Sequence, residues 1–122
     1  MKLGIIGTGM IVNEFLKMTT ELPEIQLSAI LSTERSVPKA EKLQEEYKIG
    51  ATFSKTEDFL ASEIDTVYVA VPNHLHYGFA KQALLAGKHV ICEKPFTLKY
   101  GELAELKEIA EEKELILIEA VT

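Results

Sequence analysis

A lysine stands between an acidic residue and a proline in HVICEKP, residues 89–95. The first four residues are typical of a buried strand, and Pro95 ends that strand because it has no N–H to donate. The ammonium group of Lys94 would then lie at the strand end, suited to donate a hydrogen bond to a substrate oxygen that gains negative charge during a reaction. Glu93 would hold that ammonium charged and oriented. A strand-ending turn with a solvated salt bridge explains the same residues, and the motif alone leaves both interpretations open.

A glycine loop near the N-terminus is the second candidate site. The sequence GTGMI follows the apolar stretch 2–6 and leads into a helical pattern, as in dinucleotide fingerprints. Gly7 permits a tight turn, and Gly9 lets the backbone approach a pyrophosphate at the helix N-terminus. Val12 occupies the position of the third glycine, so smaller neighbours must accommodate it. A turn without a ligand and a methyltransferase-like nucleotide site are the alternatives. The residues expected to contact the cofactor here are Gly7, Thr8, Gly9, Met10 and Ile11.

The end of the second predicted strand, in ILSTERS, indicates which dinucleotide binds. Ser32 stands where NAD-binding sites carry an acidic residue that binds the ribose 2′-hydroxyl. Ser32, Thr33 and Arg35 offer two hydroxyls and a guanidinium, which suit a 2′-phosphate better than a diol. We therefore expect NADP, with NAD as the alternative, because the carboxylate of Glu34 would repel a phosphate if it pointed inward. A plain polar loop explains any one of these residues equally well.

Two histidines follow the strand predicted at 66–71, in PNHLH. Asn73 is suited to cap the next helix. His74 and His76 are either polar residues of its first turn or part of a functional site. We expect no metal site, because no further His, Cys or acidic cluster lies nearby in the sequence.

These motifs depend on alternating strands and helices. Apolar runs predict strands at 2–6, 25–31, 51–53, 66–71, 88–92 and 115–120, and helical periodicity falls between them. Several strands are apolar on both faces, which is typical of parallel strands covered on both sides. The sequence therefore predicts an α/β fold, a doubly wound and mostly parallel Rossmann sheet with helices on both faces. Such sheets bind ligands at the carboxyl ends of their strands, where the loops at 7–12, 32–36, 72–76 and 93–97 should lie.

The composition fits one compact domain. The chain has 122 residues, 47% of them hydrophobic, and a net charge of -6 argues against nucleic acid or an acidic membrane as a partner. No apolar run approaches the ~20 residues of a membrane helix, and the N-terminus does not have the pattern of a signal peptide. Cys92 is the only cysteine, which favours a reducing compartment, so we expect a cytoplasmic protein.

Three motifs together resemble the Gfo/Idh/MocA oxidoreductase family: GIIGTGMI, the Pro-Asn-x-x-His of VPNHLH, and GKHVICEKP. The resemblance covers essentially the whole chain as the family's N-terminal NAD(P)-binding Rossmann domain. It implies that Lys94 works beside the nicotinamide as the catalytic residue. The closing LILIEAVT is similar to the branch that contains dimeric dihydrodiol dehydrogenases. The further residues that the resemblance places at the cofactor site are Pro72, Asn73, His76, Glu93 and Lys94.

The resemblance also implies what a complete family member contains. We expect a C-terminal domain, absent from this chain, that supplies the substrate pocket, a partner in proton transfer and the contacts of a homo-oligomer. The expected function is hydride transfer between the nicotinamide and a sugar, polyol or related diol, and the 122 residues alone should be inactive. A non-catalytic dinucleotide sensor of the same fold is the alternative.

Overall fold

Strands and helices alternate along the chain in the computed structural model, which describes residues 1–71, 75–93 and 100–120. A short 3-10 helix, η1, precedes the second helix. The elements are β1 (Lys2–Ile6), α1 (Met10–Thr19), β2 (Gln26–Leu31), η1 (Glu34–Ser36), α2 (Val37–Tyr47), β3 (Ala51–Phe53), α3 (Thr56–Leu60), β4 (Thr66–Val69), α4 (His76–Leu85), β5 (His89–Glu93), α5 (Tyr100–Glu112) and β6 (Leu117–Ala120).

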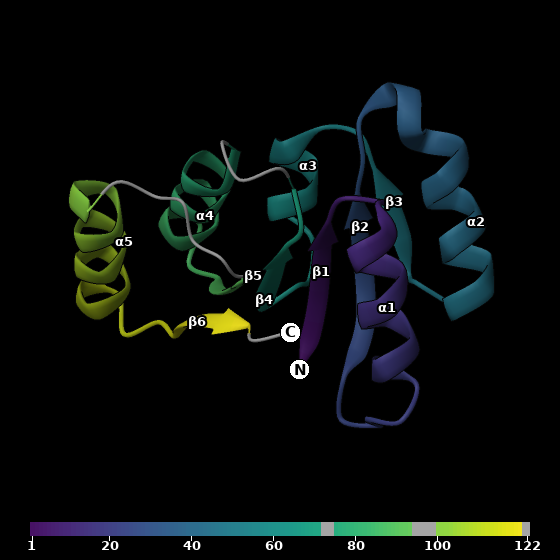
Figure 1. Ribbon diagram of the computed structural model, residues 1–122, viewed down its shortest axis with the longest axis horizontal. Coiled ribbons are helices and arrows are strands. Elements are labelled where there is room, and N and C mark those ends of the chain that lie inside the picture. Colours follow the sequence, from purple (N-terminus) through teal and green to yellow (C-terminus); the bar gives the residue numbers. More distant parts are fainter. Residues whose placement is uncertain (72–74, 94–99, 121–122) are drawn as a thin grey trace.

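The strands of the described residues form one parallel sheet in the order β3-β2-β1-β4-β5-β6. The chain moves outward from β1 to β3 and returns to β4 on the other side of β1, so the strand order reverses between β1 and β4. Helices α1 and α2 lie on one side of the sheet, whereas α4 and α5 lie on the other (Figure 1). This arrangement confirms the predicted doubly wound α/β fold.

Two apolar cores cover the two faces of the sheet. Leu3 and Ile5 of β1 pack with α1 and α2, whereas Ile6 packs with α3, α4 and α5. Successive side chains of a strand point to opposite faces, and this explains the division. On the first face, Phe15 of α1 stacks on the buried ring of Tyr68, with 3.8 Å between ring centroids. The sheet is thereby held between its helices, which fixes the loops at its edges.

Two predicted strands are two residues shorter than expected. The strand predicted at 66–71 ends at Val69, because its partner β1 ends at Ile6. The last hydrogen bond between the two segments runs from the N–H of Ala70 to the carbonyl oxygen of Ile6, at 3.0 Å. The strand predicted at 115–120 begins at Leu117. The N–H of Leu115 instead donates to Ala110 at the end of α5, at 2.7 Å.

Asp65 ties the amino-terminal edge of the sheet together. Its carboxylate accepts hydrogen bonds from the Lys2 N–H at 3.1 Å and from Thr66 Oγ1 at 2.8 Å. Desolvation is the largest single effect and raises the pKa of Asp65, but these two hydrogen bonds and the nearby charge of the N-terminus together hold the pKa below its ordinary value. In the described part of the chain, no helix is both long and apolar enough to span a bilayer.

Candidate functional site

A cleft of about 430 Å³ opens at the carboxyl edge of the sheet, where the strand order reverses. Four segments line it: the loop after β1, the segment from the end of β2 to η1, the loop after β3, and the end of β4 with the start of α4. This is the position at which open α/β sheets bind their ligands. The cleft therefore brings together the glycine loop and the end of the second strand, as the sequence predicts.

Gly7 makes the tight turn out of β1. Its φ is +123°, and a Cβ atom at this position would lie 2.3 Å from the carbonyl oxygen of Ala70. The Gly7 N–H donates to the carbonyl of Leu31 at 3.0 Å, so the turn is held against β2 as well as β4. Only glycine fits this backbone and this contact without strain. The predicted role of Gly7 in the turn is confirmed.

Gly9 has a different reason to be glycine. It is the N-cap of α1, with an extended backbone at φ −78°, and a Cβ atom here would meet nothing within 4 Å. The packing of the protein therefore does not require glycine at this position. A bare backbone next to open space at a helix N-terminus, where N–H groups point outward, is suited to a phosphate. Thr8 lies between the two glycines and lines the cleft.

Val12 fits where the fingerprint has its third glycine. It is fully buried and packs in the core with Leu3, Ile5 and Leu16. Its Cγ2 would be 3.6 Å from a Cβ atom at Gly7, an ordinary contact distance. The core next to the Gly7 turn thus accommodates the Val12 side chain.

The end of β2 presents hydroxyl groups to the cleft. Ser32 is 7% exposed, and its Oγ has no hydrogen-bond partner among the described residues. Buried hydroxyls normally have a partner, so this group is suited to bind a ligand. Thr33 Oγ1 instead accepts the N–H of Ser36 at 3.3 Å and donates to its hydroxyl at 3.2 Å. Arg35 is exposed on η1 and does not line the cleft, so its contact with a cofactor stays a prediction.

His76 supports the wall of the cleft from behind. Its side chain is buried, and Nε2 lies 2.7 Å from the carbonyl oxygen of Val71. A carbonyl only accepts, so Nε2 carries the hydrogen and donates it. Val71 lines the cleft, whereas His76 does not. His76 therefore ties the first turn of α4 to the end of β4 and positions the wall between them.

Several predicted site residues cannot be placed. Pro72, Asn73 and Lys94 lie outside the described residues, and so do the side chains of Met10, Ile11 and Glu93. The backbone of Met10 and Ile11 forms the first turn of α1, and Glu93 ends β5. Their contacts with a cofactor stay predictions.

One side of the cleft consists of residues that were not predicted from the sequence. Ser54 and Thr56 follow β3, and Leu75 and Phe79 lie at the start of α4; all four line the cleft. A signal for the first pair was present, because residues 51–53 were predicted as a strand and the loop after a parallel strand lies at the carboxyl edge. The two apolar side chains carried no such signal, since their helical spacing is equally typical of core residues.

The residues of the cleft fit a dinucleotide. Gly9 offers open backbone to a pyrophosphate, and Leu75 and Phe79 offer apolar surface to a flat ring. Ser32 offers a ribose a hydroxyl that has no partner in the part of the chain that the structure describes. These groups come from both sides of the point at which the strand order reverses. A dinucleotide that binds across this point can therefore contact all of them.

Relatives of known structure and name share this domain. The scyllo-inositol 2-dehydrogenase (NADP(+)) IolU of Bacillus subtilis is 35% identical over 98% of this chain and 36% of its own length. The trans-1,2-dihydrobenzene-1,2-diol dehydrogenase of Mus musculus is 26% identical over 97% of this chain and 36% of its own. The crystal structure of KijD10, a 3-ketoreductase from Actinomadura kijaniata in complex with NADP and TDP-benzene, has a TM-score of 0.87 and 31% identity over 98% of this chain and 36% of that one.

The chain thus spans about a third of the length of the curated relatives that it matches. Residues 1–121 match the Gfo/Idh/MocA family, which is described as an oxidoreductase family with an NAD-binding Rossmann fold. The match covers nearly the whole chain, including the glycine loop and the strands that form the cleft. This chain belongs to the Gfo/Idh/MocA oxidoreductase family and carries its NAD(P)-binding Rossmann fold.

Proposed function

We propose that this chain is the cofactor-binding domain of an NADP-preferring oxidoreductase that acts on a sugar, polyol or related diol. The observation that carries the proposal is the cleft at the strand-order reversal, which is lined by the open backbone of Gly9 and by the hydroxyl of Ser32, a group without a hydrogen-bond partner among the described residues. Family membership supports the same cofactor class.

Each part of the dinucleotide has a matching part of the cleft. The N-terminal turn of α1, with Thr8 and Gly9, holds the pyrophosphate, because its free N–H groups and the helix dipole favour anions. Ser32 binds the adenine-side ribose. The apolar side chains of Leu75 and Phe79 pack against the adenine ring. His76 keeps that wall in place through its hydrogen bond to Val71.

When bound, the nicotinamide accepts or supplies the hydride. Lys94 holds the substrate oxygen by a hydrogen bond from its ammonium group and stabilises the negative charge that this oxygen gains. Glu93 keeps the ammonium charged. Support for these two roles comes from the Glu-Lys-Pro motif and from the family, because both side chains lie outside the described part.

The substrate class is proposed from the named relatives. One is named for scyllo-inositol and another for a dihydrobenzenediol, which both carry hydroxyl groups on a six-membered carbon ring. Because the chain spans 36% of these relatives, we propose that the substrate pocket and the homo-oligomer contacts lie outside the 122 residues. On its own, the chain should bind the cofactor and turn over no polyol.

Calorimetric titration of NADPH and NADH into the chain tests the proposal. We expect binding of both, with NADPH at least as tight as NADH, and loss of both in Gly9→Val, whose side chain fills the open space beside the backbone. Arg35→Ala measures whether that guanidinium contributes to the preference. Absence of binding by the wild-type chain would refute the proposed function, and equal binding by Gly9→Val would place the pyrophosphate elsewhere.

A further inference from the structure

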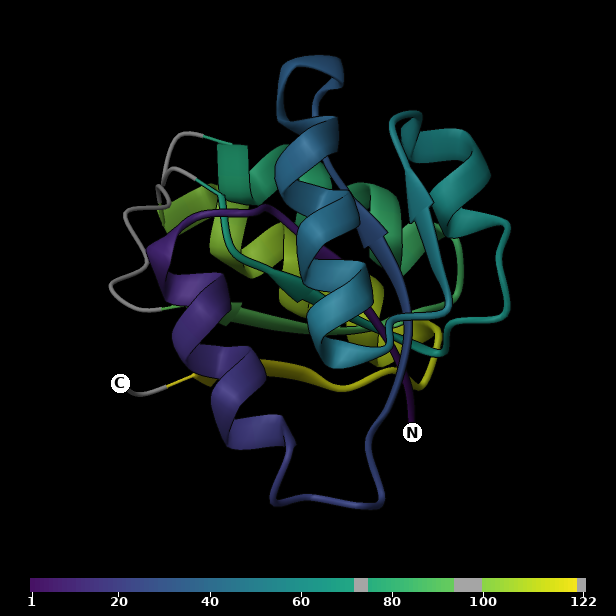
Figure 2. The same cartoon turned by 90° about the vertical axis from the view of Figure 1, so that its right-hand side faces the viewer.

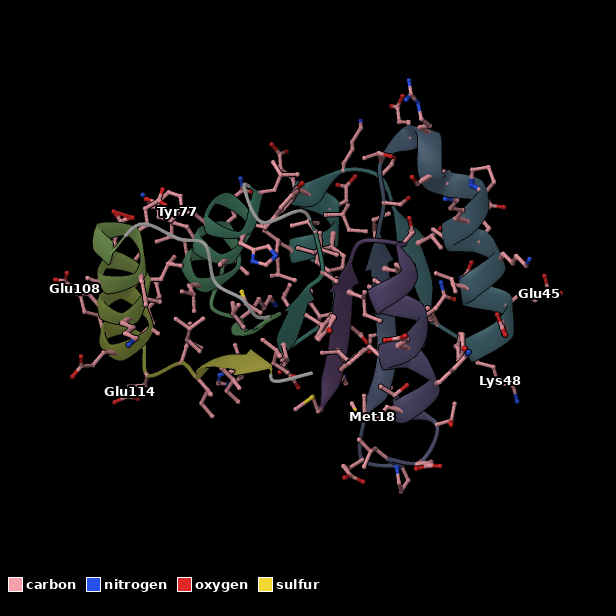
Figure 3. The ribbon with its side chains drawn as sticks, in the orientation of Figure 1. Met18, Glu45, Lys48, Tyr77, Glu108 and Glu114 are labelled. Carbon is pink, nitrogen blue, oxygen red and sulfur yellow. The ribbon has the colours of Figure 1, made fainter. Side chains whose placement is uncertain are left out.

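Three polar side chains join α4 to α5, two helices that lie side by side on the same face of the sheet (Figures 1 and 2). Tyr77 lies on the part of α4 that faces α5 (Figure 3), and its hydroxyl donates a hydrogen bond to Oε1 of Glu105. The ammonium group of Lys81 pairs with the same oxygen at 3.1 Å and donates to the Tyr77 hydroxyl at 3.4 Å. It also lies 5.6 Å from the centroid of the Tyr77 ring. Each side chain of this cluster therefore contacts the other two.

The protonation states of the cluster support one another. The hydrogen bond to Glu105 raises the pKa of Tyr77, and the hydrogen bonds from Tyr77 and Lys81 lower the pKa of Glu105. The pKa of Lys81 is raised, first by its hydrogen bond to Glu105. Around neutral pH the tyrosine is thus a donor, the carboxylate is ionised and the ammonium is charged, as all three contacts require. The side chains of Lys81 and Glu105 are 38% and 42% exposed, so the ion pair alone contributes little and the tyrosine is the main link.

The first turn of α4 depends on such external links. Its N-cap is Leu75, which makes no side-chain capping hydrogen bond among the described residues, whereas Ser, Thr, Asp or Asn normally supplies one. Gly78 disfavours the helix further, and a Cβ atom there would meet nothing within 4 Å. The turn is held from outside instead, because His76 ties it to the carbonyl of Val71 and Tyr77 ties it to α5.

This turn carries the apolar wall of the cofactor cleft. Leu75 and Phe79 both line the cleft, and at four residues apart they share one face of the helix. Tyr77 stands two residues from each of them, so a shift of its backbone displaces both. We propose that Tyr77, Lys81 and Glu105 are positioning residues, which hold this wall in place for the adenine ring by fixing the first turn of α4 to α5. The inference rests on the proposed function and deepens it.

Adenosine 5′-monophosphate and inorganic pyrophosphate are the probes, titrated into the full chain and followed by backbone amide chemical shifts. The nucleotide needs the apolar wall, whereas pyrophosphate needs only the glycine loop. Tyr77→Phe and Glu105→Gln should each weaken the nucleotide by about two- to fivefold and leave pyrophosphate unchanged, because a less ordered wall lowers the fraction of binding-competent molecules. The double variant should bind the nucleotide about as well as either single variant, since both substitutions remove the same hydrogen bond.

A rescue and two controls complete the design. Gly78→Ala favours the helix, meets no neighbour and does not alter the lining of the cleft, so it should restore part of the nucleotide affinity lost in Tyr77→Phe. Tyr47→Phe removes a tyrosine hydroxyl at the end of α2, and Glu108→Gln removes the same charge as Glu105→Gln from an exposed position on α5. Neither control residue lines the cleft, so both probes should bind these variants as they bind the wild type.

The outcomes separate the role of the cluster from the proposed function. If the wild-type chain binds the nucleotide and the cluster variants behave as the controls do, the cluster does not position the wall, while the cofactor cleft stands. Equal weakening of both probes would also overturn the inference, because it would indicate a general loss of structure. So would a Gly78→Ala substitution that restores no affinity. If the wild-type chain binds neither probe, the proposed function fails, and the positioning role fails with it.

Discussion

The two glycines of the loop should respond in opposite ways to the same substitution. In Gly7→Ala, the new methyl group would lie 2.3 Å from the carbonyl oxygen of Ala70, well inside the 3.0 Å below which such contacts are essentially never found. The backbone at φ +123° adds strain for any L-residue. In Gly9→Ala, the methyl group enters open space on an extended backbone.

The magnitudes follow from these contacts. For Gly7→Ala, unfavourable backbone conformation costs about 1–3 kcal/mol, and displacement of the turn weakens the hydrogen bond to Leu31 by about 1 kcal/mol. We therefore expect a loss of about 2–4 kcal/mol, a large part of the roughly 5–15 kcal/mol of a small domain. Gly9→Ala changes only the N-cap and should cost about 1 kcal/mol or less.

Urea unfolding followed by far-UV circular dichroism measures both values, and this signal is suitable because the chain has no tryptophan. Cofactor titration of Gly9→Ala completes the comparison, since its affinity should fall although its fold persists. A Gly7→Ala chain as stable as the wild type would refute the assignment of the tight turn. Equal destabilisation by both substitutions would show that Gly9 is required for packing.

Three further predictions concern other parts of the molecule. The ionised carboxylate of Asp65 stabilises the fold above its unfolded-state pKa near 3.8, and this contribution is lost as pH falls through the lower folded-state pKa. Asp65→Asn removes the titrating group, so the urea midpoint of the variant should fall less than that of the wild type between about pH 5 and about pH 2.5. His76→Leu should cost about 1–3 kcal/mol, because the Val71 carbonyl loses its donor, and should weaken cofactor binding, with partial rescue in His76→Gln. Lys94→Ala, in a protein that also contains the substrate domain, should lower turnover by about 10²–10³ and leave cofactor affinity unchanged. If this variant turned over substrate as fast as the wild type, Lys94 would have no part in the mechanism.

The fold was predictable because its strands are apolar on both faces and alternate with helices. The strand ends were less predictable, since local turns compete with the sheet for the same N–H groups. The N–H of Lys88 donates to Ala83 at the end of α4, and β5 therefore begins at His89 rather than at Lys88. Similarly, the N–H of Ile25 donates to Leu22, so β2 begins at Gln26. The residue types at these positions do not reveal whether the backbone N–H donates to the local turn or to the neighbouring strand.

The site was predictable where backbone geometry restricts the residue type. Gly7 was found in this way, whereas Gly9 was found from its place in the dinucleotide fingerprint, and the position of Ser32 followed from the end of a strand. Side-chain direction was not predictable. The side chain of His76 does not line the cleft but lies behind its wall, where Nε2 donates to the carbonyl oxygen of Val71. Such positions depend on the packing of segments that are distant in sequence.

Backbone amide chemical shifts recorded during NADPH titration test most directly whether the cleft binds the dinucleotide. We predict the largest changes at Gly7, Thr8, Gly9 and Ser32, smaller ones at Ser54 and Thr56, and little change along α5. Figure 3 shows Glu108 on α5, away from the helices that flank the glycine loop, which makes it a suitable reference signal. Changes centred on α5 and β6, with the glycine loop unaffected, would contradict this account.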